Sequence, residues 1–304
     1  MDKIGVFYRD EQSCREANSY SPSAGKPALV IADWLSNDQI APSIEINSFE
    51  PAARDMLYLA HSPNYVDGVL DGTRDNGFGN RSKAVAQSLL YTTGSMLAAT
   101  KSVLSHNSRR KARIAVSPTS GFHHAGFNDG GGYCTFNGLM VTAIEMYRLG
   151  LAKKIVIVDM DQHYGDGTEE IIGRLGIDYV THITAGKSYN TGEEALRVAC
   201  TGIDPGADLV LYQAGADIHV DDPLGGRLST AEMKQRDRIV FSKCKEFGIP
   251  CVWNLAGGYR RDINGSISPV LDLHRNTMLE CLGVGVTRRW PTVTDQLSTE
   301  AKHG

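Results

Sequence analysis

The sequence lacks any apolar run long enough to cross a membrane, and it lacks the features that divide a long chain into parts. No apolar stretch approaches the roughly 18 residues that a membrane-spanning helix needs. There is no internal repeat, low-complexity tract or linker rich in proline and serine. The first residues, Met-Asp-Lys-Ile-Gly, become charged too early for a signal peptide. We therefore expect one domain over residues 1–304, without a membrane partner, in which residues 289–304 form a loose tail.

An excess of one charge and closely paired cysteines are also missing. The 304 residues carry a formal net charge of −4, and 41% of them are hydrophobic. This mild acidity gives no electrostatic reason to expect nucleic acid or an anionic membrane as a partner. The six cysteines contain no CxxC pair, which is typical of reduced thiols and favours a cytoplasmic location. The composition fits a large α/β domain with ample material for a core.

The chain does contain a regular alternation of strand-like and helix-like segments. Apolar, often β-branched runs lie at residues 4–8, 113–117, 154–159, 179–183, 209–214 and 250–255. Helical patterns lie at residues 82–105, 137–149, 168–175, 193–201, 230–247 and 268–282. This alternation predicts an α/β fold with a mostly parallel central sheet and helices on both faces. Ser229 or Thr230, followed by Glu232, is expected to start the helix at 230–247.

The junction after residues 154–158 is the most informative segment. Asp159, Asp161 and His163 follow this run at alternate positions, and on an extended backbone alternate side chains share one face. Without partners, burying these groups would cost several kcal/mol each. A divalent metal removes that cost, and Asp and His are ordinary zinc ligands. A buried ion-pair cluster is the alternative reading, and it is disfavoured once Asp217 is considered as well.

Chemically active residues also follow three other predicted strands. His123 and His124 come after residues 113–117, Asp217 after 209–214, and Tyr259 after 250–255. In open α/β sheets, ligands bind in the crevice beyond the carboxyl ends of the strands. We therefore expect these groups to meet Asp161 and His163 at one rim.

Asp161, His163 and Asp217 can supply the three protein ligands of a hydrolytic zinc site, which leaves a position for water and substrate. The same donors also hold iron(II), so the residues leave both metals open. A metal with these ligands is a Lewis acid that can polarise an amide carbonyl. The predicted chemistry is metal-assisted hydrolysis.

The remaining polar residues at this rim suit proton transfer. His123 and His124 offer adjacent imidazoles that titrate near neutral pH, and Asp159 and Asp166 are the candidate carboxylate partners. Tyr259, on a Gly-Gly turn, can direct its hydroxyl toward a developing oxyanion. The glycines at 130–132 let the backbone approach a substrate beside the aromatic residue that follows them.

Several motifs in order give the chain a resemblance to the histone deacetylase superfamily. They are His61-Ser-Pro-x-Tyr65, Gly121-Phe-His-His-Ala125, Gly132-Tyr-Cys-x-Phe-Asn137, Asp159-x-Asp-x-His163, Gly165-x-Gly-Thr168, Gln213-Ala-Gly-Ala-Asp217 and Gly257-Gly-Tyr259. The resemblance spans most of the chain. It implies a single-domain, arginase-like α/β fold and a metal-dependent hydrolase of linear amides, which removes an acetyl or short acyl group from a lysine-type amine.

The resemblance also assigns catalytic roles. It places zinc on Asp161, His163 and Asp217. His124 becomes the general base and acid, oriented by Asp166. The pair of His123 and Asp159 assists electrostatically, and Tyr259 stabilises the tetrahedral intermediate.

Two further sites are implied by the resemblance. A structural potassium ion would be held by the side chain of Asp159 and the backbone of Asp161 and His163, with Thr181 and His182 as further candidates. A narrow tunnel for the acyl-lysine stem would be lined by Gly132 and Tyr133. Tyr189 is the candidate for the opposite wall.

The chain departs from the family pattern where the substrate is recognised. Residues 71–81 do not match the rim loop that grips a peptide backbone in many relatives. Leu224 stands where relatives specialised for acetylpolyamines carry an acidic residue, which argues against a cationic polyamine tail. The expected substrate is an acylated lysine peptide or a small acylated amine. The sequence leaves the oligomeric state and the preferred acyl length open.

Three other functions remain. The same site could hydrolyse acetylpolyamines or another small amide. A catalytically silent acyl-lysine binding module is disfavoured, because His124, Asp166 and Tyr259 are all present. A manganese-dependent ureohydrolase, like arginase, shares the implied fold but would need His123 and Asp159 as ligands of a second metal.

Overall fold

The computed structural model describes residues 3–14, 21–105 and 113–285, so the predicted tail at 289–304 lies outside the described residues. The strands are β1 (Ile4–Phe7), β2 (Ile44–Asn47), β3 (Ile114–Val116), β4 (Ile155–Asp159), β5 (Val180–Ile183), β6 (Leu209–Gln213) and β7 (Cys251–Asn254). The α-helices are α1 (Lys26–Leu35), α2 (Arg54–Leu57), α3 (Pro63–Leu70), α4 (Lys83–Leu104), α5 (Gly138–Arg148), α6 (Asp166–Leu175), α7 (Gly192–Thr201), α8 (Thr230–Phe247) and α9 (Ser268–Gly285). Two short 3-10 helices, η1 (Asp10–Gln12) and η2 (Ala41–Ser43), complete the order.

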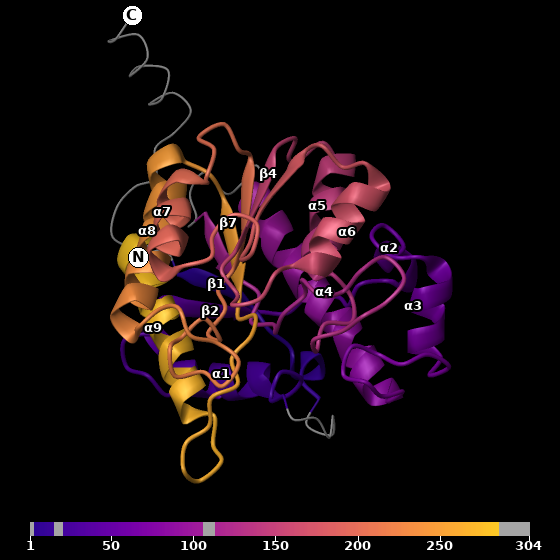
Figure 1. Cartoon of the computed structure of the whole chain (residues 1–304), viewed down its shortest axis with the longest axis horizontal. Coiled ribbons are helices and arrows are strands. Elements are labelled where there is room, and N and C mark those ends of the chain that lie inside the picture. Colours follow the sequence, from indigo (N-terminus) through magenta and orange to yellow (C-terminus); the bar gives the residue numbers. More distant parts are fainter. Residues whose placement is uncertain (1–2, 15–20, 106–112, 286–304) are drawn as a thin grey trace, which may run out of the picture.

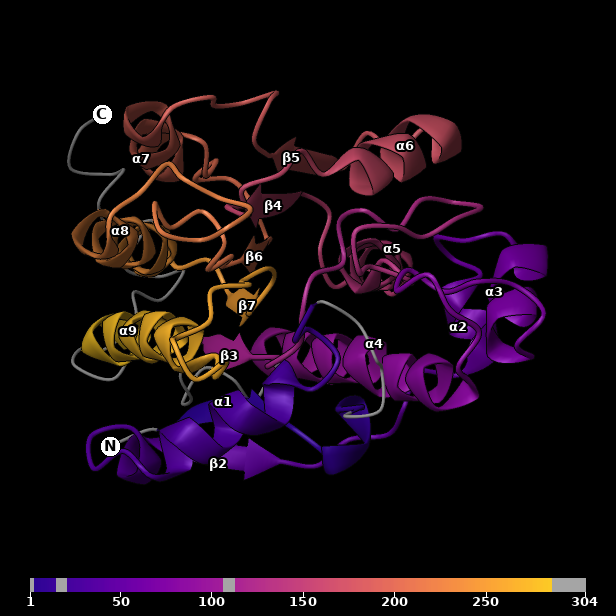
Figure 2. The ribbon, with the colours of Figure 1, turned by 60° about the horizontal axis from the view of Figure 1, so that its bottom comes forward.

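The strands form one seven-stranded sheet in the order β2-β1-β3-β7-β6-β4-β5. Every described pairing in this sheet is parallel. Helices α1, α7, α8 and α9 cover one face, and α4, α5 and α6 cover the other (Figures 1 and 2). Helices α2 and α3 lie outside α4, away from the sheet (Figure 2). The predicted α/β fold with helices on both faces of a parallel sheet is confirmed.

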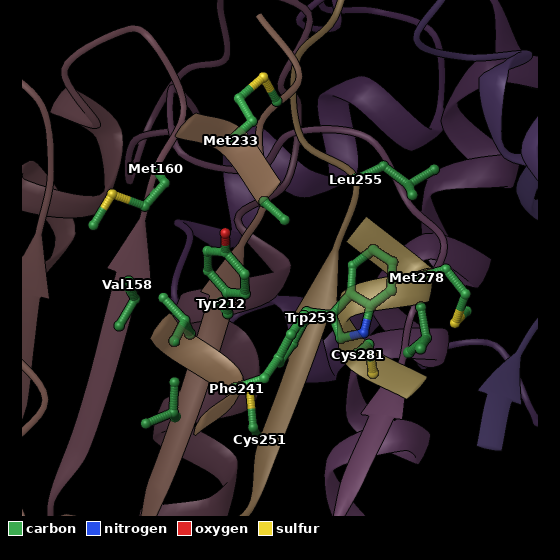
Figure 3. Close-up of a cluster of buried hydrophobic side chains, with 14 of the residues drawn as sticks. Val158, Met160, Tyr212, Met233, Phe241, Cys251, Trp253, Leu255, Met278 and Cys281 are labelled. Carbon is green, nitrogen blue, oxygen red and sulfur yellow. The ribbon is translucent and has the colours of Figure 1, made fainter. Parts of the chain in front are cut away.

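The core explains why the central strands are apolar throughout. Successive side chains of a strand point to opposite faces; along β4, Ile155 and Ile157 pack with the α4–α5 side, whereas Val156 and Val158 pack with the α8–α9 side. Both faces are covered by helices, so neither set can be polar. Figure 3 shows the α8–α9 side, where aromatic rings fill the space next to β6 and β7.

The strand order places the predicted site residues at one edge. Strands β3, β7, β6 and β4 are consecutive in the sheet, and parallel strands have their carboxyl ends at the same edge. These are the four strands whose following loops carry His123, Tyr259, Asp217 and Asp161. Residues more than 130 positions apart in sequence therefore converge through the sheet alone.

Four elements were absent from the sequence prediction: β2, α1, α2 and α3. β2 is an edge strand with the sequence Ile-Glu-Ile-Asn, of which only Ile44 is buried. Its short, half-polar pattern gives little periodic signal. α2 spans only four residues, and the amphipathic patterns of α1 and α3, each opened by a proline, were not recognised.

The start of α8 follows the predicted capping signal. Of the two candidates, Ser229 is the N-cap: its side chain accepts the backbone N–H of Glu232, and Glu232 in return accepts the backbone N–H of Ser229 at 2.8 Å. This reciprocal arrangement is a capping box. α6 begins at Asp166, two residues before the predicted start, which brings a catalytic candidate into its first turn. Across the described ranges, no helix is long and apolar enough to cross a membrane.

Candidate active site

Asp161, His163 and Asp217 converge as a potential metal site. One ligand atom from each lies within 4.8 Å of the other two. His163 Nδ1 is 3.0 Å from Asp161 Oδ1 and 3.2 Å from Asp217 Oδ2. Asp217 Oδ2 is buried and accepts no hydrogen bond of regular geometry. Two carboxylates and an imidazole with an unsatisfied buried oxygen are a donor set that a divalent cation fits.

The pKa shifts of Asp217 and His163 also favour a cation bound at this trio. Burial, with repulsion from Asp161, raises the pKa of Asp217 to about 7. The adjacent carboxylates of Asp161 and Asp217 raise the pKa of His163 to about 10. Burial disfavours the charge on Asp217, and the two carboxylates share the one positive charge that His163 can supply. A divalent ion among them supplies that charge and lets His163 coordinate as a neutral imidazole.

The backbone after β4 turns instead of continuing as a strand. β4 ends at Asp159, whose Oδ1 accepts the N–H of Asp161 at 3.2 Å, and Asp161 Oδ1 accepts the N–H of His163 at 3.0 Å. Such side-chain-to-backbone bonds two residues on are typical of Asp in turns. The expectation that residues 159, 161 and 163 share one extended face is therefore wrong. Asp161 and His163 join the trio, while Asp159 contacts His123.

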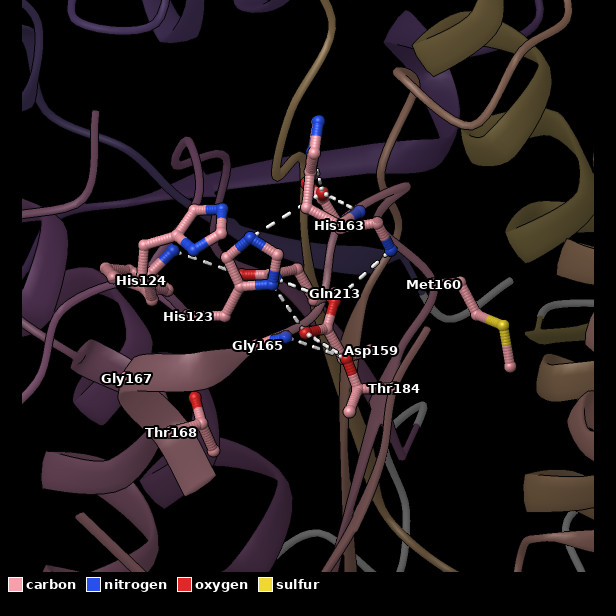
Figure 4. A network of polar contacts seen from close by, with 12 residues as sticks. His123, His124, Asp159, Met160, His163, Gly165, Gly167, Thr168, Thr184 and Gln213 are labelled. Atoms are coloured by element: carbon pink, nitrogen blue, oxygen red, sulfur yellow. Dashed lines mark hydrogen bonds and ion pairs between the residues drawn. The ribbon is translucent and has the colours of Figure 1, made fainter. Parts of the chain in front are cut away.

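Two imidazole–carboxylate pairs lie beside the trio, and Figure 4 shows the rings of His123 and His124 near His163, with Asp159 next to His123. His123 Nδ1 is 2.6 Å from Asp159 Oδ2, and His124 Nδ1 is 2.6 Å from Asp166 Oδ1. The two rings are 4.1 Å apart between centroids. These are the pairs that the resemblance implies. In each pair the carboxylate accepts a hydrogen bond from Nδ1–H, which fixes the orientation of the ring.

The two imidazoles have opposite charge preferences. Burial lowers the pKa of His123, but Asp159 and Asp161 outweigh burial and raise it to about 9. Burial lowers the pKa of His124, and the charge on His123 lowers it further. His124 is thus neutral near pH 7, and its side chain is 22% exposed, whereas that of His123 is 2% exposed. Titratable neighbours pushed apart in this way are a recurring mark of acid–base sites.

Gln213, the last residue of β6, supports the buried pair and was not among the predicted site residues. Its Nε2 donates to Asp159 Oδ1 at 2.8 Å, and its Oε1 accepts the N–H of Phe122 at 3.1 Å. It thereby fixes Asp159 and the backbone just before His123. The sequence signal for Gln213 was a polar residue at the end of an otherwise apolar strand.

Tyr259 lies on the turn after β7 and is 7% exposed. Its ring centroid is 5.7 Å from that of Tyr133. Burial, with the charges of Asp217 and Asp161, raises the pKa of Tyr259 well above its ordinary value. The phenol therefore stays protonated and can act only as a hydrogen-bond donor to an anion.

Gly257, two residues before Tyr259, lies against the metal trio. Its N–H donates to Asp161 Oδ2 at 3.0 Å. A Cβ at this position would stand 2.2 Å from Asp217 Oδ2 and 2.8 Å from Asp161 Oδ2. Only glycine lets this backbone approach both carboxylates.

We expect Gly257→Ala to displace the two carboxylates and to weaken metal binding by about 10- to 100-fold, as losses of supporting contacts do. Gly173→Ala in α6 is the matched control, because a Cβ there meets nothing within 4 Å. Metal titration of the two folded variants gives the comparison. Wild-type affinity in Gly257→Ala would show that the trio does not hold the metal as described.

Gly132 and Tyr133 lie next to the catalytic pairs. Gly132 has φ of +51°, and a Cβ there would be 2.4 Å from His124 Cδ2. Tyr133 also has positive φ, +65°, which is uncommon for an aromatic residue and is found at functional sites. Tyr133 and Phe78 line a small cleft whose lining does not include the metal trio or the two imidazoles. Leu224, 41% exposed, lies on the loop after Asp217. The roles of Gly132, Tyr133 and Leu224 in substrate binding stay predictions.

The prediction that Tyr189 forms a wall of the substrate tunnel is wrong. Its side chain is 1% exposed, and its hydroxyl donates to the backbone carbonyls of Asp159 at 3.1 Å and Asp161 at 2.9 Å. The loop before it is short, so the ring packs beneath the β4 turn instead of reaching the rim. Tyr189 supports the metal ligand loop from below.

The prediction for Thr181 as a potassium ligand is also wrong. Thr181 pairs with Val156, three residues before Asp159, which puts it roughly 10 Å away along the sheet, and it is exposed. The threonine that contacts Asp159 is Thr184, whose Oγ1 lies 3.5 Å from Asp159 Oδ2. His182 contacts this region through its ring, which lies 3.5 Å from Asp159 Oδ2. Potassium binding stays a prediction.

Comparison with known proteins agrees with this geometry. The histone deacetylase domain model matches residues 23–175, which include both imidazole pairs, Asp161 and His163. An uncharacterized protein of Picosynechococcus sp. is 28% identical over 73% of this chain and 81% of its own length. Histone deacetylase 2 of Arabidopsis thaliana is 28% identical over 77% of this chain and 66% of its own length. Acetylpolyamine amidohydrolase of Mycoplana ramosa is 46% identical over 18% of this chain and 16% of its own length.

The matched domain model covers half of the chain. The fold and the site define a metal-dependent type of hydrolase. The chain belongs to the histone deacetylase family and is a hydrolytic enzyme of the deacetylase and amidohydrolase class.

Proposed function

We propose that this enzyme is a zinc-dependent deacylase that removes an acetyl or other short acyl group from a lysine-type amine. The observation that carries the proposal is the meeting of three groups at one sheet edge: the trio Asp161, His163 and Asp217, the His124–Asp166 pair, and Tyr259. Each alone has a structural explanation. Together they offer metal ligands, a neutral base and a protonated donor at one edge of the sheet.

Zinc bound to the trio would polarise the amide carbonyl and increase the acidity of a water molecule. His124 donates Nδ1–H to Asp166, so its Nε2 accepts a proton from the water and returns it to the leaving amine. His123, charged and paired with Asp159, lowers the pKa of His124 and stabilises negative charge nearby. The hydroxyl of Tyr259 donates a hydrogen bond to the carbonyl oxygen of the acyl group as negative charge develops on that oxygen.

Hydrolysis of acetylpolyamines or other small acylated amines is the second candidate. The local similarity to acetylpolyamine amidohydrolase favours it. Against a polycationic substrate stands Leu224, an exposed apolar residue at the position where an acidic group would attract the amine. We therefore rank a neutral or monocationic amine above a polyamine.

A two-metal ureohydrolase and a silent binding module fit less well. His123 and Asp159, the spare ligands for a second metal, are hydrogen-bonded to each other at 2.6 Å. Within the part of the chain that the structure describes, the trio is the one group of three ligand atoms close enough to hold an ion. A module that only binds an acyl-lysine needs no general base, whereas His124 is neutral and oriented by the carboxylate of Asp166.

A substrate panel on metal-quantified protein tests the proposal. We expect one zinc per chain and turnover of an acetyl-lysine amide at least about 10-fold faster than of acetylputrescine, because the exposed apolar side chain of Leu224 offers no opposite charge to a second ammonium group. Faster hydrolysis of acetylputrescine would favour the second candidate. Turnover of neither, with two manganese ions per chain, would reject the deacylase.

A further inference from the structure

The turn that carries Tyr259 has an unusual backbone. Ala256 has φ of +54° and Gly258 has φ of +143°. A left-handed conformation at an alanine is unfavourable, so it persists only where surrounding contacts hold it. The contacts that hold this turn therefore decide where the Tyr259 hydroxyl lies.

Two buried charges of opposite sign hold the two ends of the turn. At its start, the ammonium of Lys26 on α1 donates to the carbonyl oxygen of Ala256 at 2.5 Å, and the lysine is fully buried. At its end, Asp222 Oδ2 accepts the backbone N–H of Tyr259 at 2.7 Å and that of Arg260 at 3.1 Å. Charge-assisted bonds of this length are among the stronger ones in proteins.

Asp222 also holds its own loop, the one that carries Leu224. Its Oδ1 accepts the N–H of Leu224 at 3.0 Å, and the residue is 6% exposed. One carboxylate therefore connects the Tyr259 turn with the Leu224 loop, and it does so through three backbone N–H groups. Sequence reasoning assigned it no role.

We propose that Asp222 is a positioning residue for catalysis, which sets the location of the Tyr259 hydroxyl relative to the metal trio. The proposal rests on the deacylase function proposed above. It predicts that substitution of Asp222 lowers turnover only because the Tyr259 hydroxyl is displaced. A misplacement of about 1 Å in a catalytic group can lower the rate by about 100-fold, so the loss of this anchor should be readily measurable.

The test is a double-mutant cycle with Asp222→Ala and Tyr259→Phe, assayed on an acetyl-lysine amide. We expect Asp222→Ala to lower kcat by about 10-fold or more in the wild-type background while KM changes less. In the Tyr259→Phe background, the same substitution should lower kcat less than about twofold, because residues that act as a unit are not additive. Asp222→Asn, which keeps one acceptor oxygen, should recover part of the loss.

Asp221→Asn is the matched control. Asp221 is the adjacent residue and pairs with the side chain of Arg260 at 2.8 Å, but it makes no bond to the backbone of the Tyr259 turn. It should keep kcat within about twofold of wild type. Equal losses from Asp222→Ala in both backgrounds, or wild-type kcat in Asp222→Ala, would overturn the proposal. If Asp222→Ala does not fold with its metal, Asp222→Asn takes its place in the cycle with the same criterion.

Crystal structures of the Asp222→Ala and Asp221→Asn variants give a readout that does not depend on turnover. Displacement of the Tyr259 ring in the first variant alone supports the anchor, even if wild-type enzyme cleaves no acyl amine and the deacylase function fails. An unmoved ring in both variants contradicts the anchor, even if the deacylase function holds.

Discussion

Asp217→Asn is expected to remove metal binding and activity together. The substitution keeps the shape of the side chain but replaces an anionic ligand by a neutral amide, a poor partner for zinc. Substitutions outside the ligand shell typically weaken metal affinity by 10- to 100-fold, so we expect a loss above about 100-fold here. Metal content after dialysis and turnover of an acetyl-lysine amide measure the two effects.

The same substitution should stabilise the metal-free protein. Burial and Asp161 raise the pKa of Asp217 to about 7, so the folded metal-free chain favours the neutral form of this side chain. A raised pKa means that folding stability falls as pH rises through about 7. Asparagine stays neutral and avoids this loss, so its thermal midpoint at pH 8 without metal should exceed that of wild type.

A control variant and a clear contrary outcome complete this test. Asp38→Asn changes an exposed aspartate and should alter neither metal content nor the thermal midpoint. Stoichiometric metal in Asp217→Asn would show that this residue is not a ligand. The metal-centred reading of the site would then have to be abandoned.

Tyr259→Phe is expected to separate metal binding from catalysis. The phenyl ring keeps the contact with Tyr133, 5.7 Å away between centroids, and the hydroxyl does not belong to the metal trio. Metal content and folding should therefore match wild type. Removal of one oxyanion donor typically costs about 100- to 1,000-fold in kcat, and we expect a loss in that range with little change in KM.

Steady-state kinetics on an acetyl-lysine amide, with metal measured on the same samples, provide the result. Full activity of Tyr259→Phe would contradict the donor role. Loss of metal along with activity would instead mean that the turn after β7 supports the trio through Tyr259 and not only through Gly257.

The sequence predicted the fold class and the rim because the relevant signals are local. Buried parallel strands are apolar on both faces, and residues 154–159 and 209–214 show this directly. Polar residues that directly follow such strands lie at the carboxyl edge of the sheet. The motif order then implied which carboxylate partners each imidazole. β2 escaped because an edge strand with one buried residue gives little periodic signal. α1 does carry an amphipathic pattern over ten residues, which was not recognised.

The sequence by itself determined the chemistry of the site: two carboxylates and an imidazole that suit a metal, two imidazoles with carboxylate partners, and a tyrosine on a glycine turn. Only the tertiary structure decided which residues support them. Tyr189 packs under the β4 turn, Gln213 links Asp159 to the backbone before His123, and Asp222 and Lys26 hold the Tyr259 turn. Such supporting contacts join segments up to 230 residues apart. They depend on the direction of individual side chains, which spacing along the chain does not encode.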